Sequence, residues 1–348
     1  MSNYKKEDRH VEILCHIVNS YIENALPVSS KYVMEKMGKN ISSATIRNVM
    51  SLMEEEGYIE QPHTSAGRIP TDLGYRRYVD YIKENVTIEK KQGERLENEF
   101  SARIEDIKDL IKKTSNIMSR ELKGIGIVMW PSLADFYLKR IELIQLRREA
   151  VLAILVTMAD IVREYIIKIE ETSFTGDLKS AENFINFNYE SKSIAFLFED
   201  LKKLKNENLR GQINIVINGA YEIIESIIRD NSETEMYWEG DGYFAERFDR
   251  DNIDTTRRAF QIFFHKDEIA ELMRSELPSK RVNVYIGSEN KCDILKECGV
   301  VTGGYELDGR VVGRIGVIGP KRMDYDNAFK TVNFFSELLS DKIREMFY

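Results

Sequence analysis

The chain begins with two helical patterns, each followed by a residue that ends a helix. The spacing of these patterns constrains the fold more than any other feature. Apolar residues from Lys5 to Asn24 recur every three or four positions, as on the buried face of a helix, and Pro27 ends that pattern. Val28-Ser29-Ser30 then supplies an N-cap for a short second helix, which is expected to stop at Gly38. The two helices are therefore joined by a tight connection.

A third helix follows almost at once. It is predicted to begin at Ile41-Ser42-Ser43 and to end at Gly57, with an apolar stripe along one side. A helix, a short helix, a turn and another helix within so short a stretch are the layout of a helix-turn-helix.

The next residues have the pattern of a β-hairpin followed by a closing helix. Residues 58–61 are typical of a strand, residues 63–68 of a turn-rich tip, and residues 69–71 of the returning strand. A helix is expected over residues 73–82. Residues 1–85 therefore predict a winged helix-turn-helix, which is a DNA-binding architecture.

Charge supports this interpretation only when it is counted locally. The whole chain of 348 residues has a formal net charge of -8, which does not suggest a nucleic-acid partner. Residues 1–85, however, hold 11 Lys and Arg against 12 Asp and Glu, a net charge of -1, and no acid occurs in residues 39–53 or 61–71. Because attraction to phosphate is a property of one face, DNA contacts are expected in these two acid-free windows.

The candidate DNA-binding residues lie in those windows. On the third helix, polar side chains that point away from the apolar stripe can reach base edges, and Arg and Asn can do so with two hydrogen bonds at once. Residues at the start of the helix would contact phosphates, and the wing would press on the backbone or the minor groove. A solvated helix face and an ordinary hairpin tip remain the alternatives at this point. The predicted DNA-binding residues are Lys39, Asn40, Ser42, Ser43, Thr45, Arg47, Asn48, His63, Thr64, Ser65, Gly67 and Arg68.

The rest of the chain predicts a connector helix and an α+β region. Residues 86–122 are charge-rich with apolar residues at helical spacing, which indicates a long amphipathic helix, with an interruption near Gly93 left open. Strands with a terminal helix packed across them indicate an α+β, sensor-like domain. The expected elements are strands over residues 136–146, 151–157, 164–169 and 282–286, a strand pair over 309–318, and a helix over 327–347.

Residues 173–275 differ from the strand-rich segments on either side, because their pattern is largely helical and they are rich in aromatic side chains. An insertion at this point explains why the strand pattern stops and resumes, which divides the α+β domain into residues 123–172 and 276–348. Aromatic side chains concentrate in cores and at interfaces, so a core or a dimer face is a more typical use of this segment than a ligand pocket.

Signals for an enzyme are weak throughout. GRIGVIG lacks the GK[ST] of a phosphate-binding loop, and HTSAG does not match a nucleophile elbow. The four histidines and three cysteines form no metal-binding set, so neither a cofactor nor a metal is expected. No apolar run reaches the roughly 18 residues that span a bilayer, and the first residues lack a secretory apolar segment. A cytoplasmic protein without a membrane partner is therefore expected.

Two blocks of the sequence resemble a known family. They resemble the characteristic blocks of the HrcA family, the bacterial heat-inducible transcription repressors. The first block is SSATIRNVM with EEEGYIEQPHTSAGRIPTDLGYRRYVD, and the second, near the C-terminus, is GRVVGRIGVIGPKRMDY. The resemblance implies a multidomain α+β architecture with an N-terminal winged helix, a GAF-like domain, and a dimerisation domain inserted into it. The sequence departs from the family at Val49 and Leu52, which are apolar where polar residues are expected on the third helix.

The resemblance also implies a function. Such repressors bind as homodimers to an inverted-repeat operator upstream of chaperone operons, and the GroEL chaperonin helps to keep them active. The second hypothesis is a small-molecule-responsive winged-helix regulator whose GAF-like domain is the sensor. An enzyme with an accessory DNA-binding head has little support, because no nucleophile–base pair accompanies the head.

Overall fold

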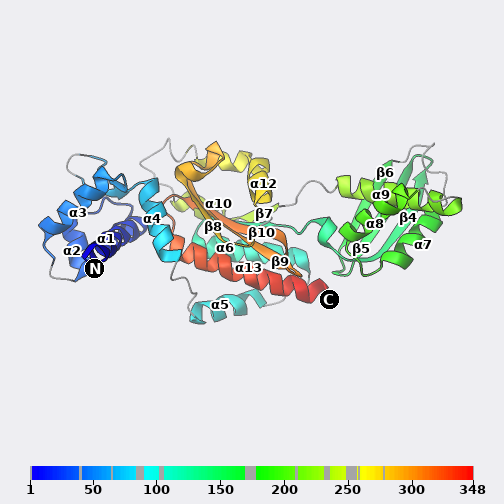
Figure 1. Ribbon diagram of the computed structural model, residues 1–348, viewed down its shortest axis with the longest axis horizontal. Helices are drawn as coiled ribbons and strands as arrows, with labels where there is room; N and C mark the ends of the chain where they lie inside the picture. Colours follow the sequence, from blue (N-terminus) through cyan, green and yellow to red (C-terminus); the bar gives the residue numbers. More distant parts are fainter. Residues whose placement is uncertain are drawn as a thin grey trace.

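The computed structural model shows an elongated molecule made of three bodies (Figure 1). We call them the head, which holds the N-terminus, the central body, which is built on a five-stranded sheet, and the three-stranded body. The described residues are 2–38, 41–63, 66–83, 90–101, 106–168, 178–207, 211–230, 236–247, 257, 259–276 and 279–347.

The head has its elements in the predicted order. They are α1 (Ser2–Asn24), α2 (Ser30–Met37), α3 (Ser43–Glu55), β1 (Ile59–Glu60), β2 (Ile69–Pro70) and α4 (Asp72–Lys83). The predicted helix signals are confirmed in detail, because the Ser29 side chain caps α2 by accepting a hydrogen bond from the Tyr32 amide, and Gly38 ends α2 in the left-handed conformation. Ile13, Ile46 and Ile59 are almost fully buried together, so one small core holds the helices and the hairpin in place.

The central body has helices on both faces of its sheet. The strand order is β7-β3-β10-β9-β8, and every neighbouring pair is antiparallel. One face packs on α6 and α13 and the other on α10 and α12, while α5 lies against α6 and α13 (Figure 1). The strands are β3 (Ile125–Met129), β7 (Met236–Glu239), β8 (Asn283–Ile286), β9 (Cys298–Leu307) and β10 (Arg310–Pro320), and the helices are α5 (Lys90–Ser101), α6 (Ile107–Leu122), α10 (Asp241–Arg247), α12 (Lys266–Ser275) and α13 (Tyr325–Phe347).

The three-stranded body is an antiparallel sheet of order β4-β5-β6 with helices on one face. Its outer β4 edge is covered by side chains from α7, because Asn186 exchanges two hydrogen bonds of 2.8 Å with the backbone of Ile141, and Glu182 accepts one from the Leu143 amide at 3.0 Å. Such contacts protect an edge strand from unwanted pairing. The elements are β4 (Leu138–Arg147), β5 (Ala150–Thr157), β6 (Val162–Lys168), α7 (Leu178–Tyr189), α8 (Ile194–Asn206) and α9 (Gln212–Asp230).

This arrangement corrects the predicted division of the α+β region. The sequence pattern grouped residues 123–172 with residues 276–348, but β4, β5 and β6 pair only with one another, and β3 alone joins the central sheet from the first segment. Conversely, β7, α10 and α12 fall in the predicted insertion over residues 173–275 and pack on the central sheet. Alternating apolar residues indicate a strand but not its partner, which is why the boundary was placed wrongly.

The connector over residues 86–122 also differs from the single helix that was predicted. It contains two helices, α5 and α6, and Gly93 lies inside α5. Asp106 caps α6 by accepting a hydrogen bond from the Asp109 amide at 2.8 Å, so a second helix begins after Asp106. Residues 86–89 and 102–105 of this stretch, and residue 169 of the strand predicted over 164–169, lie outside the described residues.

Candidate nucleic-acid interface

Helix α3 buries one side in the head and presents the other to solvent. Its apolar stripe belongs to the core of the head, and Thr45, Arg47 and Asn48 lie exposed on the opposite side. Val49 and Leu52 are the two positions where the sequence is apolar and polar residues were expected. Val49 is half-buried against the core, and Leu52 is 41% exposed. The packing of α3 is therefore that of an ordinary amphipathic helix, with one leucine left on its outer surface.

The serines at the start of α3 have structural partners. The Ser42 hydroxyl accepts a hydrogen bond from the Thr45 amide at 3.1 Å and lies 2.9 Å from the Thr45 hydroxyl. The Ser43 hydroxyl lies 3.1 Å from that of Ser30, so it joins α2 to α3. A hydroxyl can both donate and accept, so these contacts leave capacity for a further ligand. Lys39 and Asn40, which precede α3, lie outside the described residues.

Arg47 is an exposed cation on the outer face of α3. Within the described part of the chain it has no acidic group in ion-pair range, although it is exposed. Its guanidinium donors are therefore open to solvent. The acids nearest in sequence, Glu54, Glu55 and Glu56, are at the opposite end of α3. The N-terminal half of α3 thus combines the positive end of the helix dipole with an exposed cation.

The hairpin after α3 is short, and hydrogen bonds join its two arms. Ile59 pairs with Pro70 and Glu60 with Ile69. The Gln61 side chain donates a hydrogen bond of 2.9 Å to the Ala66 carbonyl, and the Ala66 amide donates one of 2.8 Å to the His63 carbonyl. His63 is exposed, while Thr64 and Ser65 lie outside the described residues.

Gly67 and Arg68 attach the hairpin to the rest of the head. A Cβ at Gly67 would collide with the Val28 carbonyl, so only glycine fits this close approach. Arg68 exchanges two backbone hydrogen bonds of 2.9 Å with Val28, and its guanidinium binds Glu54 with Nε–Oε2 and Nη2–Oε2 distances of 2.9 and 2.7 Å. The sequence suggested a tight turn at Gly67 and a charged fork at Arg68, and the structure gives both residues a packing role within the head.

Three positioning residues were not found from the sequence. Glu54 holds Arg68, Gln61 holds the tip, and the Thr71 hydroxyl donates to the Gly57 and Tyr58 carbonyls and accepts from the Gly74 amide. Thr71 directly precedes α4, where a capping hydroxyl is common, and this position was the one available signal. The other two contacts depend on partners that are distant in sequence.

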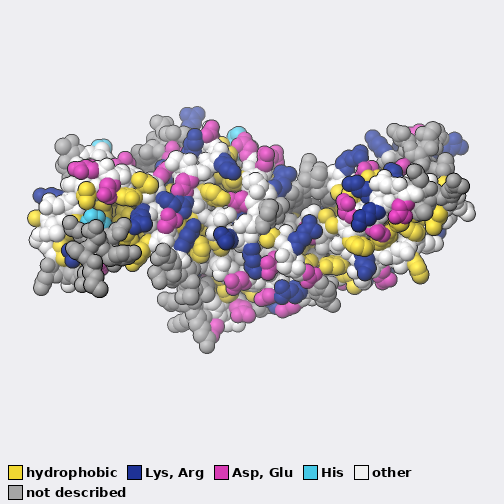
Figure 2. Space-filling view, viewed as in Figure 1, with side chains coloured by type: hydrophobic (Ala, Val, Ile, Leu, Met, Phe, Trp, Pro, Cys, Tyr) yellow, Lys and Arg dark blue, Asp and Glu magenta, His cyan; other side chains and the backbone are white. Residues whose placement is uncertain are grey.

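Outside the head, the described residues show mixed surface charge and no cluster of metal ligands. On the face of the central body that Figure 2 shows, Lys and Arg are interspersed with Asp and Glu. Among the residues that the structure describes, no three His, Cys, Asp or Glu side chains are placed to hold a metal ion. None of the described helices has the length and apolarity needed to cross a membrane. Burial raises the pKa of the Cys15 thiol to about 11 and that of Cys298 to about 12, so both thiols are protonated at neutral pH.

Comparisons with known proteins agree over the whole chain. A family model described as the C-terminal domain of the HrcA protein matches residues 108–329. The heat-inducible transcription repressor HrcA of Syntrophobacter fumaroxidans is 33% identical over 350 residues, which cover 99% of each chain. That of Ruminiclostridium cellulolyticum is 30% identical over 341 residues, which cover 98% of each chain.

A solved structure is similar as well. It is described as the crystal structure of a hypothetical protein and matches with a TM-score of 0.65 and 26% sequence identity, over 97% of this chain and 99% of that chain. The matches therefore include the head, which lies outside the residues of the family model.

Proposed function

Because this chain belongs to the HrcA family of heat-inducible transcription repressors, we propose that it represses chaperone operons by binding their operators through α3 and the β1–β2 hairpin. Members of this family are transcription repressors and not enzymes. The observation that carries the proposal is the exposed face of α3, where Arg47 and Asn48 have a rigid support and no acidic partner within the described residues.

In this proposal the head is a winged helix-turn-helix. The N-terminal half of α3 enters the major groove, where Arg47 and Asn48 hydrogen-bond to base edges. Ser42, Ser43 and Thr45 contact phosphates near the positive end of the helix. The wing follows the adjacent backbone or minor groove.

We propose that the protein is a homodimer held by the open face of the three-stranded sheet. By register, Ile144, Leu152 and Ile166 form one row on the face that the helices leave uncovered. Ile144 is 45% exposed, Ile166 is 67% exposed, and Val162 on the same face is 56% exposed. Two copies related by a twofold axis would cover each other's row, and two heads related by the same axis match an inverted repeat.

We also propose that the GroEL chaperonin assists this repressor in the cytoplasm. The same apolar row is open to solvent whenever the dimer is apart, which is the kind of surface that leads to aggregation during heating. Refolding yield, measured as recovered operator binding, should rise when the chaperonin is present. Equal yields with and without it would contradict this part of the proposal.

The operator proposal is tested by DNA binding. A labelled inverted repeat from the region upstream of the chaperone genes should bind far more tightly than a scrambled duplex of equal length. Each phosphate neutralised by the protein should contribute about 0.9 to the slope of log affinity against log salt. Equal affinity for the repeat and the scrambled duplex would reject the proposal.

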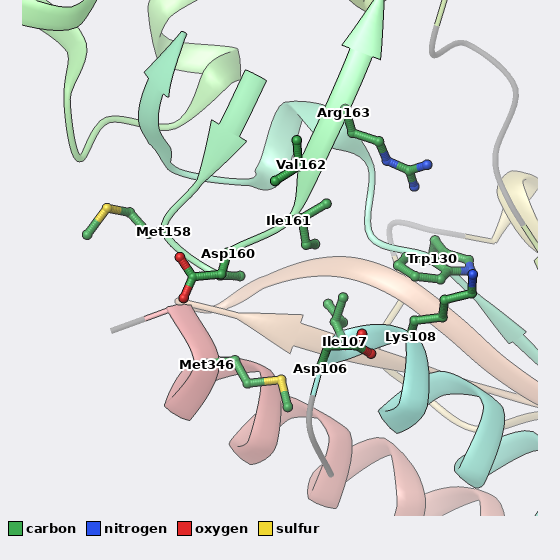
Figure 3. A pocket seen from close by; sticks show the side chains of 11 residues that line it. Asp106, Ile107, Lys108, Trp130, Met158, Asp160, Ile161, Val162, Arg163 and Met346 are labelled. Carbon is green, nitrogen blue, oxygen red and sulfur yellow. The ribbon is translucent and has the colours of Figure 1, made fainter. Parts of the chain in front are cut away.

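A cavity between the central and three-stranded bodies favours a second candidate function, the small-molecule-responsive regulator. Its volume is about 540 Å³, within the range of small-molecule sites. Figure 3 shows Trp130, Lys108 and Arg163 on one side and Met158 and Met346 on the other, which suits an anion with an apolar part. The two acids of the lining have other contacts, because Asp106 caps α6 and Asp160 pairs with Lys139 at 2.7 Å.

This second function is tested through Trp130, which is one of two tryptophans in the chain. In a Trp238→Phe variant the fluorescence comes from Trp130 alone, so titration with octanoate should change it if the cavity binds such an anion. Octanol is the matched neutral control, and Lys108→Met should weaken the octanoate response. An emission that octanoate leaves unchanged would remove the candidate.

A further inference from the structure

Helix α4 belongs to two bodies at once. Its Tyr78 hydroxyl donates a hydrogen bond of 2.7 Å to the Asn19 side chain, and Val79 is buried in the same core, so this side of α4 is part of the head. Its other side lies against β8 and the start of α13 in the central body (Figure 1). Any rotation of the head must therefore carry α4 across the central body.

The contact between α4 and the central body is polar and specific. Arg76 binds both carboxylate oxygens of Glu289, with Nε–Oε1 at 2.6 Å, and donates a further hydrogen bond of 2.6 Å to the Val284 carbonyl. The Asp72 carboxylate accepts a hydrogen bond of 2.9 Å from the Ser288 amide and lies 3.1 Å from Lys321 Nζ. Paired, forked contacts of this kind fix direction as well as distance.

Apolar packing supports the same contact. The rings of Tyr75 and Tyr325 lie 5.7 Å apart, and both side chains are buried. A Cβ at Gly287 would collide with the Asp72 carboxylate, so the central body approaches the start of α4 as closely as its backbone allows. Such a close fit leaves little freedom for a different orientation of α4.

The start of α4 is also tied to the end of α3. The Thr71 hydroxyl donates to the Gly57 carbonyl at 2.6 Å, the Thr71 amide donates to Tyr58, and Gly74 approaches the Tyr58 carbonyl too closely for any side chain. The orientation of the proposed recognition helix is therefore carried through Thr71 and α4 to the central body.

We infer that Arg76 and Asp72 are positioning residues that set the spacing of operator half-sites which the dimer accepts. This inference rests on the proposed function, because it requires two heads on one operator. A head held at a fixed angle raises the effective concentration of the second head at one half-site spacing and lowers it at others. Neither residue is among those proposed to touch DNA, so they act through the orientation of α3.

The test compares three duplexes: the inverted repeat, the same repeat with half a helical turn inserted between its half-sites, and a single half-site. For the wild type, the insertion should weaken binding by about a hundredfold. Arg76→Ala should bind the native repeat about tenfold more weakly, lose most of the spacing dependence, and keep the affinity of the single half-site. Arg77→Ala is the matched control, because Arg77 is an exposed cation of the same helix. It should keep the wild-type spacing dependence.

An unchanged spacing penalty in Arg76→Ala would overturn the inference. Asp72→Asn is the second variant, and it should give the same loss of spacing dependence if the Arg76 variant folds poorly. A readout without DNA separates this inference from the proposed function. Nitroxide labels at Lys36→Cys and Arg344→Cys, with Cys292→Ser, should give one narrow distance distribution in the wild-type background and a broad one with Arg76→Ala, when labelled protomers are mixed with an excess of unlabelled ones so that each dimer carries one labelled pair. Identical distributions would overturn the inference even if operator binding had failed for every variant.

Discussion

Helices α3 and α4 lie in the same head and are both amphipathic, yet their polar faces differ in what they contact. On α3, Arg47 and Asn48 face solvent without an acidic partner among the described residues. On α4, Asp72 and Arg76 are engaged with the central body. The difference shows that an exposed polar stripe on a helix can serve either a partner molecule or another part of the same chain, and that the contacts of its charged groups distinguish the two.

This comparison assigns opposite effects to the two helices. A substitution of a predicted DNA-binding residue on the outer face of α3 should change DNA binding and leave stability unchanged. A substitution on the inner face of α4 should change stability or geometry first. Four experiments test this division.

The largest effect is expected at Tyr75, the residue of α4 that is buried against Tyr325. Tyr75→Ala removes a buried ring and should lower the free energy of unfolding by about 3–5 kcal/mol, measured by urea denaturation. Tyr75→Phe is the matched control. It should cost nothing or stabilise the protein, because the buried Tyr75 hydroxyl has no hydrogen-bond partner among the described residues. A small effect of Tyr75→Ala would mean that α4 does not hold the head.

The second effect is a loss of stability at alkaline pH. Burial raises the pKa of both Tyr75 and Tyr325 well above the usual value, so the folded state keeps these phenols neutral. The unfolded state loses their protons above about pH 10, so stability is present below that pH and falls above it, by about 1.4 kcal/mol per pH unit for each phenol. Tyr75→Phe should reduce this pH dependence, whereas Tyr81→Phe, at a residue of α4 that is 45% exposed, should not. Equal pH profiles for the two variants would contradict the prediction.

The third effect concerns the outer face of α3. Arg47→Ala should weaken operator binding by about 1–3 kcal/mol if Arg47 contacts a base, and anisotropy titration measures this loss. The urea midpoint should not change, because the side chain is exposed. Ser51→Ala is the control, because Ser51 is exposed on the same helix but is not among the predicted DNA-binding residues, and it should change neither value. A large stability loss with Arg47→Ala would show that α3, like α4, is held by its polar face.

Sequence reasoning was strongest where local chemistry decides the structure. Val28-Ser29-Ser30 and Ile41-Ser42-Ser43 were predicted to begin helices and Gly38 to end one, because these signals depend only on neighbouring residues. The structure confirms them, with Ser29 and Ser42 as the N-caps and Gly38 as the C-cap. The family was also identified from short motifs, and the family model confirms it. The DNA-binding assignments remain predictions, since an exposed Arg47 and Asn48 fit them without testing them.

Sequence reasoning failed where distant partners decide the structure. Strand β9 was missed because its glycines and its unbroken burial give no alternation, and the pair expected over residues 309–318 is the single strand β10. The partners of Arg76 and Arg68 lie 213 and 14 residues away, at Glu289 and Glu54, and nothing local indicates either contact.

The smallest effect is expected at the contact between the hairpin and α3. Arg68 and Glu54 are partly exposed, at 18% and 34%, so a double-mutant cycle should give a coupling of only about 0.3–1 kcal/mol in stability. The same variants decide how Arg68 serves DNA binding. If it acts by holding the wing, Glu54→Ala should weaken operator binding as much as Arg68→Ala does. If it contacts a phosphate, Arg68→Ala alone should weaken binding, and the salt slope should fall by about 1. The second result would show that Arg68 both stabilises the head, through Glu54, and binds DNA. A single side chain would then combine the two roles that α3 and α4 otherwise keep apart.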